Sequence, residues 1–144
     1  PEQLRDLITA AIRVKADIVG RDERERGERR KLNLGHTLAH AIEKCSDRMN
    51  HGEAVAVGIA LMAGAARRLG LLDAAQCDRI VGLLERLGFD LQPPVPLERL
   101  LREAGHDKKN EQGTLHIVLP AGIGDCVVRD IPTAEFATLF TDAR

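Results

Sequence analysis

Three histidines within 16 residues are the side chains of this sequence best suited to chemistry. His36 and His40 are four residues apart, so on a helix their rings project from one face. His51 follows where the next helix is predicted to begin. Imidazole is the commonest neutral metal ligand, and this spacing lets two rings converge on one point. The pattern predicts either a metal site or a set of helix-surface and capping histidines.

Cationic and amide side chains near the histidines favour the first interpretation. Lys15 projects near the middle of the apolar arc of its predicted helix, where it either reaches solvent or enters a polar cavity. Asn33 falls with His36 and His40 within an arc of about 60°, and Arg29 joins it if that helix extends back by one turn. Such a group fits an anionic, hydroxylated ligand beside a metal.

Helices are the elements predicted to position these residues. Apolar residues recur at helical spacing over residues 2–19 and again over 32–46. The segment 21–31 between them holds six basic and four acidic residues and is predicted to be solvated and salt-bridged. Residues 52–69 are apolar on nearly all sides and rich in Ala and Gly, which suits the centre of a helical bundle.

The rest of the chain adds shorter elements. Asp73 is a good N-cap for a helix through Leu87. After a proline-rich connector the sequence predicts a short helix over residues 97–104. It then predicts a hairpin with strands over 114–119 and 125–129, followed by a closing helix over 133–142. The predicted fold class is mainly α: one domain over residues 1–144, a helical bundle with a small antiparallel β-hairpin near the C-terminus.

Composition excludes several classes of function. The chain has 144 residues, 44% hydrophobic and 30% charged, with a net charge of −1, so binding to nucleic acid or to an anionic membrane surface is not expected. There is no Trp or Tyr to stack on bases. The longest uncharged apolar stretch, residues 54–66, is shorter than the roughly 20 residues of a membrane span.

The cysteines and the first residues predict a cytoplasmic protein. The three cysteines are scattered and contain no CxxC pair, which fits a reducing compartment. No signal peptide is expected, because the first 15 residues already mix charged and apolar side chains.

Two other polar features have competing explanations. Glu53, at the start of the helix over 52–69, interacts favourably with the helix dipole or orients a histidine. Residues 107–110, with the sequence DKKN, are by default a solvated loop.

The order of these motifs resembles the C-terminal half of the 3-dehydroquinate synthase family. The resemblance is carried by DERERGERRKLNLGHTLAHAIE, then HGEAVAVGIALMAGAARRLGLL, then DKKN with the hairpin, and it covers essentially the whole chain. Within these motifs Leu38 and Ala39 stand where the family often has Phe and Gly.

This resemblance implies a lyase of the shikimate pathway, and so of aromatic amino acid biosynthesis. The family converts 3-deoxy-arabino-heptulosonate 7-phosphate into 3-dehydroquinate and releases phosphate. Bound NAD oxidises a hydroxyl transiently, and a divalent metal, usually Zn²⁺ and otherwise one such as Co²⁺, holds and polarises substrate hydroxyls.

Matched position by position, the resemblance assigns roles to individual residues. His36 and His51 match the metal ligands, and Glu25 matches a position near the substrate. His40 matches a substrate-binding position and is also the candidate for moving a proton during phosphate loss. The remaining substrate-binding positions match Lys15, Arg29, Asn33 and Lys109, with Lys108 as the other choice for the last.

Two parts of the family pattern are not found in the chain. These are the N-terminal NAD-binding domain and a glutamate metal ligand in an AE-x-x-K motif. The chain alone is therefore expected to be inactive, with a sugar phosphate, the missing domain and a second copy in a homodimer as its partners. Two alternatives remain: a related cyclase of the 2-deoxy-scyllo-inosose or valiolone type, and a non-catalytic helical interaction module.

Overall fold

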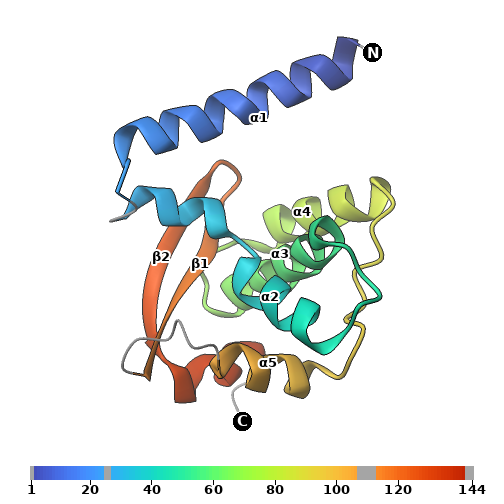
Figure 1. The fold of residues 1–144 in the computed structure, drawn as a ribbon, viewed down its shortest axis with the longest axis vertical. Helices are drawn as coiled ribbons and strands as arrows, with labels where there is room; N and C mark the ends of the chain where they lie inside the picture. Colours follow the sequence, from blue (N-terminus) through green and yellow to red (C-terminus); the bar gives the residue numbers. More distant parts are fainter. Residues whose placement is uncertain (1, 25–26, 107–112, 142–144) are drawn as a thin grey trace. The chain divides into compact units, whose positions relative to one another are not determined.

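The computed structural model describes residues 2–24, 27–106 and 113–141. They fall into two compact units, residues 1–33 and residues 34–144, which are considered separately below. Figure 1 labels the α-helices and the strands. The fold is mainly helical with one antiparallel hairpin near the C-terminus, as predicted. No helix in the described part of the chain is both long and apolar enough to cross a membrane.

The N-terminal unit consists of two helices. The α-helix α1 spans Glu2–Arg21, which confirms the first predicted helix, and the 3-10 helix η1 spans Glu28–Asn33. No residue of α1 is buried, and Leu7 and Ile12 remain 66% and 62% exposed.

The connection between α1 and η1 is held by polar contacts. The Asp22 carboxylate accepts hydrogen bonds from the backbone N–H groups of Gly27 at 2.7 Å and Arg29 at 3.0 Å. Glu28 forms ion pairs with Arg21 at 3.0 Å and Lys31 at 3.9 Å. The segment is salt-bridged, as its charge pattern predicted.

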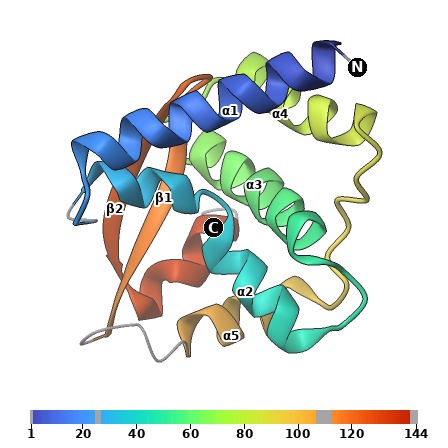
Figure 2. The same cartoon turned by 45° about the horizontal axis from the view of Figure 1, so that its top comes forward.

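The C-terminal unit is built around the helix α3, His51–Arg68, shown in green in Figure 2. Eight of its 18 residues are buried, most of them Ala or Gly, so neighbouring elements approach closely. It packs against α2 (His36–Cys45), α4 (Ala74–Arg86), the hairpin and the C-terminal 3-10 helix.

The helix predicted over 32–46 is interrupted at Gly35. Residues up to Asn33 form η1, and α2 begins only at His36. Gly35 has a φ of +80°, a left-handed conformation that residues with a Cβ adopt at a cost. The predicted helical arc that joined Asn33, and Arg29 behind it, to the histidines is therefore wrong. The histidine pair on α2 is unaffected.

The hairpin and the last helices close the unit. Strands β1 (Thr114–Gly122) and β2 (Asp125–Pro132) pair antiparallel, with Val118 opposite Val128. Helix α5 spans Leu97–Gly105, and the predicted closing helix is the 3-10 helix η3, Thr133–Phe140. Asp142, its predicted end, lies outside the described residues.

Two apolar clusters form the core of this unit. The larger one joins α3 to the hairpin, α5 and η3, with Met62, Ile117 and Phe136 at most 1% exposed. The smaller one joins α2, α3 and α5 through Ala39, Ile42, Ala54, Val57 and Leu100. The smaller cluster fixes the pair of helices that carries all three candidate histidines.

Candidate metal centre

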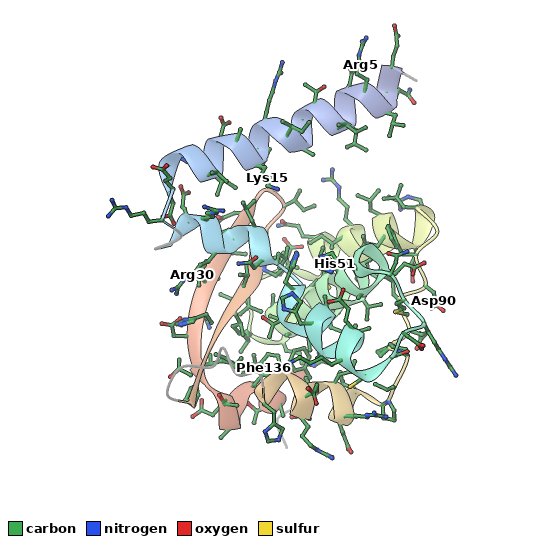
Figure 3. The ribbon with its side chains drawn as sticks, viewed as in Figure 1. Arg5, Lys15, Arg30, His51, Asp90 and Phe136 are labelled. Carbon is green, nitrogen blue, oxygen red and sulfur yellow. The ribbon has the colours of Figure 1, made fainter. Side chains whose placement is uncertain are left out.

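The three candidate histidines form one cluster between α2 and α3. The ring centroids of His36 and His51 are 5.3 Å apart, and those of His36 and His40 are 5.9 Å apart. His40 and His51 are 6.4 Å apart with nearly parallel rings. Figure 3 labels His51, at the start of α3. The structure thus brings the rings of His36 and His51, which the family resemblance matched to the metal ligands, close together.

A hydrogen bond on the Nδ1 atom orients both rings. Nδ1 of His36 lies 3.2 Å from the backbone oxygen of Leu34, and Nδ1 of His51 lies 2.8 Å from Oε1 of Glu43. A carbonyl and an ionised carboxylate can only accept, so each Nδ1 carries the hydrogen and donates. The lone pair of each neutral ring then lies on Nε2, the atom available to a metal.

Close backbone packing between α2 and α3 holds this arrangement. A Cβ on Gly58 would lie 2.2 Å from the backbone oxygen of Gly35, so the backbones of these two segments are in contact at the two glycines. A Cβ on Gly35 would in turn lie 2.8 Å from the backbone nitrogen of Ile59. Neither position has room for a side chain. The contact fixes the first turn of α2, and with it His36, against α3.

The two histidines fit a divalent metal. Imidazoles that share a tetrahedral zinc at a Zn–N distance of about 2.0–2.1 Å have ring centroids roughly 5 Å apart. The observed 5.3 Å agrees with this separation. Among residues 2–24, 27–106 and 113–141, however, no three His, Cys, Asp or Glu side chains are grouped so that they could hold a metal. The described residues could therefore supply two imidazoles, and any further ligand would come from other groups.

His40 lies one turn from His36 on the same face of α2, and it is half-buried. Its ring is next to both of the other imidazoles, with its centroid 5.9 Å from that of His36 and 6.4 Å from that of His51. An imidazole there can donate to an anionic ligand or exchange a proton with it.

The other predicted binding residues belong to the N-terminal unit or lie outside the described residues. Lys15 is exposed on α1, and Asn33 is exposed at the end of η1. The Arg29 guanidinium donates through Nη1 to the backbone oxygen of Glu23 at 3.0 Å. A cleft shared by these residues and His40 stays a prediction. Glu25, Lys108 and Lys109 lie outside the described residues.

The two glutamates near the histidines have different roles from one another. Glu53 forms a capping box with Asn50: its backbone N–H donates to the Asn50 side chain at 3.0 Å, and its carboxylate accepts from the Asn50 backbone at 2.8 Å. Of its two interpretations, the structural one is correct. The carboxylate that orients a histidine is Glu43, which was not singled out. The sequence did contain a signal for Glu43, because this residue is seven positions after His36 and therefore lies on the same face of the helix.

The model of the family described as "3-dehydroquinate synthase C-terminal" matches residues 1–110. The chain belongs to the 3-dehydroquinate synthase family. Within this family it corresponds to the C-terminal domain, where its motifs had placed it.

Relatives called 3-dehydroquinate synthase cover almost all of the chain. The protein from Halorhodospira halophila is 45% identical over 140 residues, which are 95% of this chain and 38% of that protein. The protein from Xanthomonas campestris is 43% identical over 152 residues, or 99% and 41%. The chain therefore spans about two fifths of the length of these curated relatives.

Solved structures of two other synthases share the fold. A 2-deoxy-scyllo-inosose synthase, complexed with carbaglucose-6-phosphate, NAD⁺ and Co²⁺, has a TM-score of 0.78 and 26% identity over 100% of this chain and 42% of its own. A 2-epi-5-epi-valiolone synthase from Streptomyces hygroscopicus, with NAD⁺ and Zn²⁺ bound, has a TM-score of 0.81 and 25% identity over 96% and 39%.

Proposed function

We propose that this chain is the metal- and substrate-binding domain of a 3-dehydroquinate synthase. The complete enzyme would convert 3-deoxy-arabino-heptulosonate 7-phosphate into 3-dehydroquinate and release phosphate. The observation that carries the proposal is the pair of imidazoles of His36 and His51, 5.3 Å apart with both Nδ1 atoms engaged. This donor set lies in a chain whose relatives of 43–45% identity are called 3-dehydroquinate synthase.

In this proposal His36 and His51 hold a divalent metal, Zn²⁺ or Co²⁺, through their Nε2 atoms. A bound metal would polarise substrate hydroxyls by acting as a Lewis acid. The solved neighbours, which contain Co²⁺ and Zn²⁺, support this choice of metals. A third protein ligand would come from outside the described residues, because two imidazoles leave a tetrahedral shell half filled.

The remaining assigned residues bind and protonate the substrate. Lys15, Arg29, Asn33 and Lys109, or Lys108 in place of the last, would donate to its carboxylate and phosphate, because both groups are anionic acceptors. His40 would bind the substrate and exchange a proton during phosphate loss. Support for His40 comes from the position of its ring, whose centroid lies 5.9 Å from that of the His36 ring.

NAD would be held by a part of the enzyme that this chain does not contain. When bound, NAD⁺ would supply a reversible oxidation, taking a hydride from the carbon that carries a substrate hydroxyl and returning it later. Support comes from the lengths of the relatives and from the neighbours solved with NAD⁺. We place the enzyme in the cytoplasm, which suits three cysteines that are scattered along the sequence without a CxxC pair.

Phosphate release from the heptulosonate phosphate tests this function. The chain alone, with NAD and Zn²⁺, should release none above a His36→Ala control, because it has no unit to hold the dinucleotide. Joined to an NAD-binding half from a family member, it should turn over. His36→Ala in the joined protein should lower the rate at least about 100-fold, the upper end for loss of an outer-shell partner. Release by the chain alone, or full activity of the joined variant, would contradict the proposal.

A related sugar-phosphate cyclase is the second candidate, because the solved neighbours are synthases of the inosose and valiolone types. They share only 25–26% identity with this chain, against 43–45% for the 3-dehydroquinate synthases. Assaying the joined protein on the substrates of both classes separates the two candidates. Turnover confined to another sugar phosphate would replace the first assignment by the second.

A further inference from the structure

A carboxylate on α2 stands behind the imidazole of His51. Oε1 of Glu43 lies 2.8 Å from Nδ1 of His51, across the gap between α2 and α3. The Glu43 side chain is 36% exposed and the His51 side chain 55% exposed, so solvent reaches this pair. A histidine at the first residue of a helix has few neighbours to fix its ring. For His51 this hydrogen bond provides the fixed orientation.

The same face of α2 carries the other histidines. His36, His40 and Glu43 follow at spacings of four and seven residues, so they lie along one stripe of the helix. The apolar face of α2, with Ala39 and Ile42, is packed against α3 and α5. Packing of that face therefore holds Glu43 in register with His36, and Glu43 in turn reaches His51 on the next helix.

We propose that Glu43 is a positioning residue for the metal site, which holds His51 with its hydrogen on Nδ1 and its lone pair on Nε2. The proposal rests on the metal role of His51 proposed above. A carboxylate on the far nitrogen of a metal-binding imidazole fixes the tautomer and ring orientation and raises the basicity of the ligand. His36 obtains its tautomer from the Leu34 carbonyl instead and does not depend on Glu43.

The tautomer of each histidine ring provides a test that needs no metal. Long-range ¹H–¹⁵N NMR spectra of the metal-free chain, at a pH where the imidazoles are neutral, distinguish Nδ1–H from Nε2–H. We expect Nδ1–H for both His36 and His51. In Glu43→Ala the His51 ring should become a mixture of tautomers while His36 stays unchanged, so His36 serves as the internal control. Glu43→Gln keeps an acceptor and should keep the tautomer.

Titration with Zn²⁺ alone provides the second readout. Glu43→Ala should weaken Zn²⁺ binding about 10- to 100-fold, and Glu43→Gln less, because only the charge is lost. Glu103→Ala is the matched control. Glu103 is on α5 and pairs at 3.8 Å with Lys44, the residue next to Glu43 on α2, so this variant also removes a carboxylate near the site. It should change neither the affinity nor the tautomers.

The outcomes separate this proposal from the one it rests on. An unchanged His51 tautomer in Glu43→Ala, or equal Zn²⁺ affinity in all variants, would overturn the positioning role alone. Failure of the unaltered chain to bind Zn²⁺ would overturn the metal role and the positioning role together. If Glu103→Ala lost as much Zn²⁺ affinity as Glu43→Ala, the effect would come from the loss of any nearby negative charge, and this would contradict the proposal.

Discussion

Helices α1 and α3 differ sharply in what their apolar residues do. Both are long, with 20 and 18 residues, and both begin with a glutamate in the first turn. Eight residues of α3 are buried, whereas none of α1 is. The apolar stripe of α1 leaves Leu7, Ile8 and Ile12 at least 50% exposed.

This difference shows what an apolar periodicity can and cannot predict. The periodicity of α1 predicted its helix correctly, because spacing alone decides which residues share a face. It could not predict burial, which requires a second surface to pack against. The candidate ligands His36 and His51 are on helices fixed by packing, while Lys15 and Arg29 belong to the N-terminal unit, whose long helix has no buried residue. Large exposed apolar surfaces commonly mark sites of contact with other protein surfaces.

The largest expected effect comes from a matched pair of truncations in the two helices. Met62 in α3 is 1% exposed, so Met62→Ala should lower the free energy of unfolding by about 2–4 kcal/mol. Ile12 in α1 is 62% exposed, so Ile12→Ala should change the free energy of unfolding by no more than about 0.5 kcal/mol. Chemical denaturation of both variants measures this difference. Equal losses would mean that the stripe of α1 is covered in solution.

A second pair compares two glycines of α3. Gly58→Ala should lower the free energy of unfolding by about 1–3 kcal/mol, because the new methyl group would meet the Gly35 backbone oxygen 2.2 Å away. It should also weaken metal binding, since the first turn of α2 must move. In Gly64→Ala the nearest atom is Nη1 of Arg68 at 3.5 Å, so this variant should be neutral or more stable by up to about 1 kcal/mol. A loss in Gly64→Ala as large as in Gly58→Ala would contradict this account, because Ala favours the helix over Gly at both positions and only Gly58 meets the Gly35 backbone.

The smallest expected effect is local to the start of α4. The backbone N–H of Gln76 donates to the Asp73 carboxylate at 2.7 Å and lowers the pKa of Asp73 below its usual value of 3.8. The charged form thus stabilises the folded chain above that value, and this contribution disappears as the pH falls through the lowered pKa. Asp73→Asn retains an N-cap without the charge. Its stability should fall slightly below that of the unaltered chain at neutral pH and equal it in acid, as thermal melts across this range can show.

Much of the C-terminal unit could be predicted from the sequence, and the exceptions have physical causes. The spacing of His36 and His40 placed their rings on one helical face, and the family resemblance paired His36 with His51. The continuous helix through Asn33 was wrong, since the left-handed Gly35 and its contact with Gly58 depend on tertiary packing. Glu43 was missed because its partner lies on another helix, and a single helical face does not show what it meets. Metal and substrate roles depend on groups outside the described residues and stay predictions.

A Zn²⁺ titration of the chain tests the central claim most directly. Isothermal calorimetry should show one Zn²⁺ per chain, with binding weakened at least about 10-fold in His36→Ala and in His51→Ala, because each variant removes one of two imidazole ligands. His106→Ala is the control. His106 is the C-cap of α5 and is not one of the three clustered histidines, so this variant should bind Zn²⁺ as the unaltered chain does. Equal binding by all four proteins, or none by the unaltered chain, would contradict the assignment of His36 and His51 as the metal ligands.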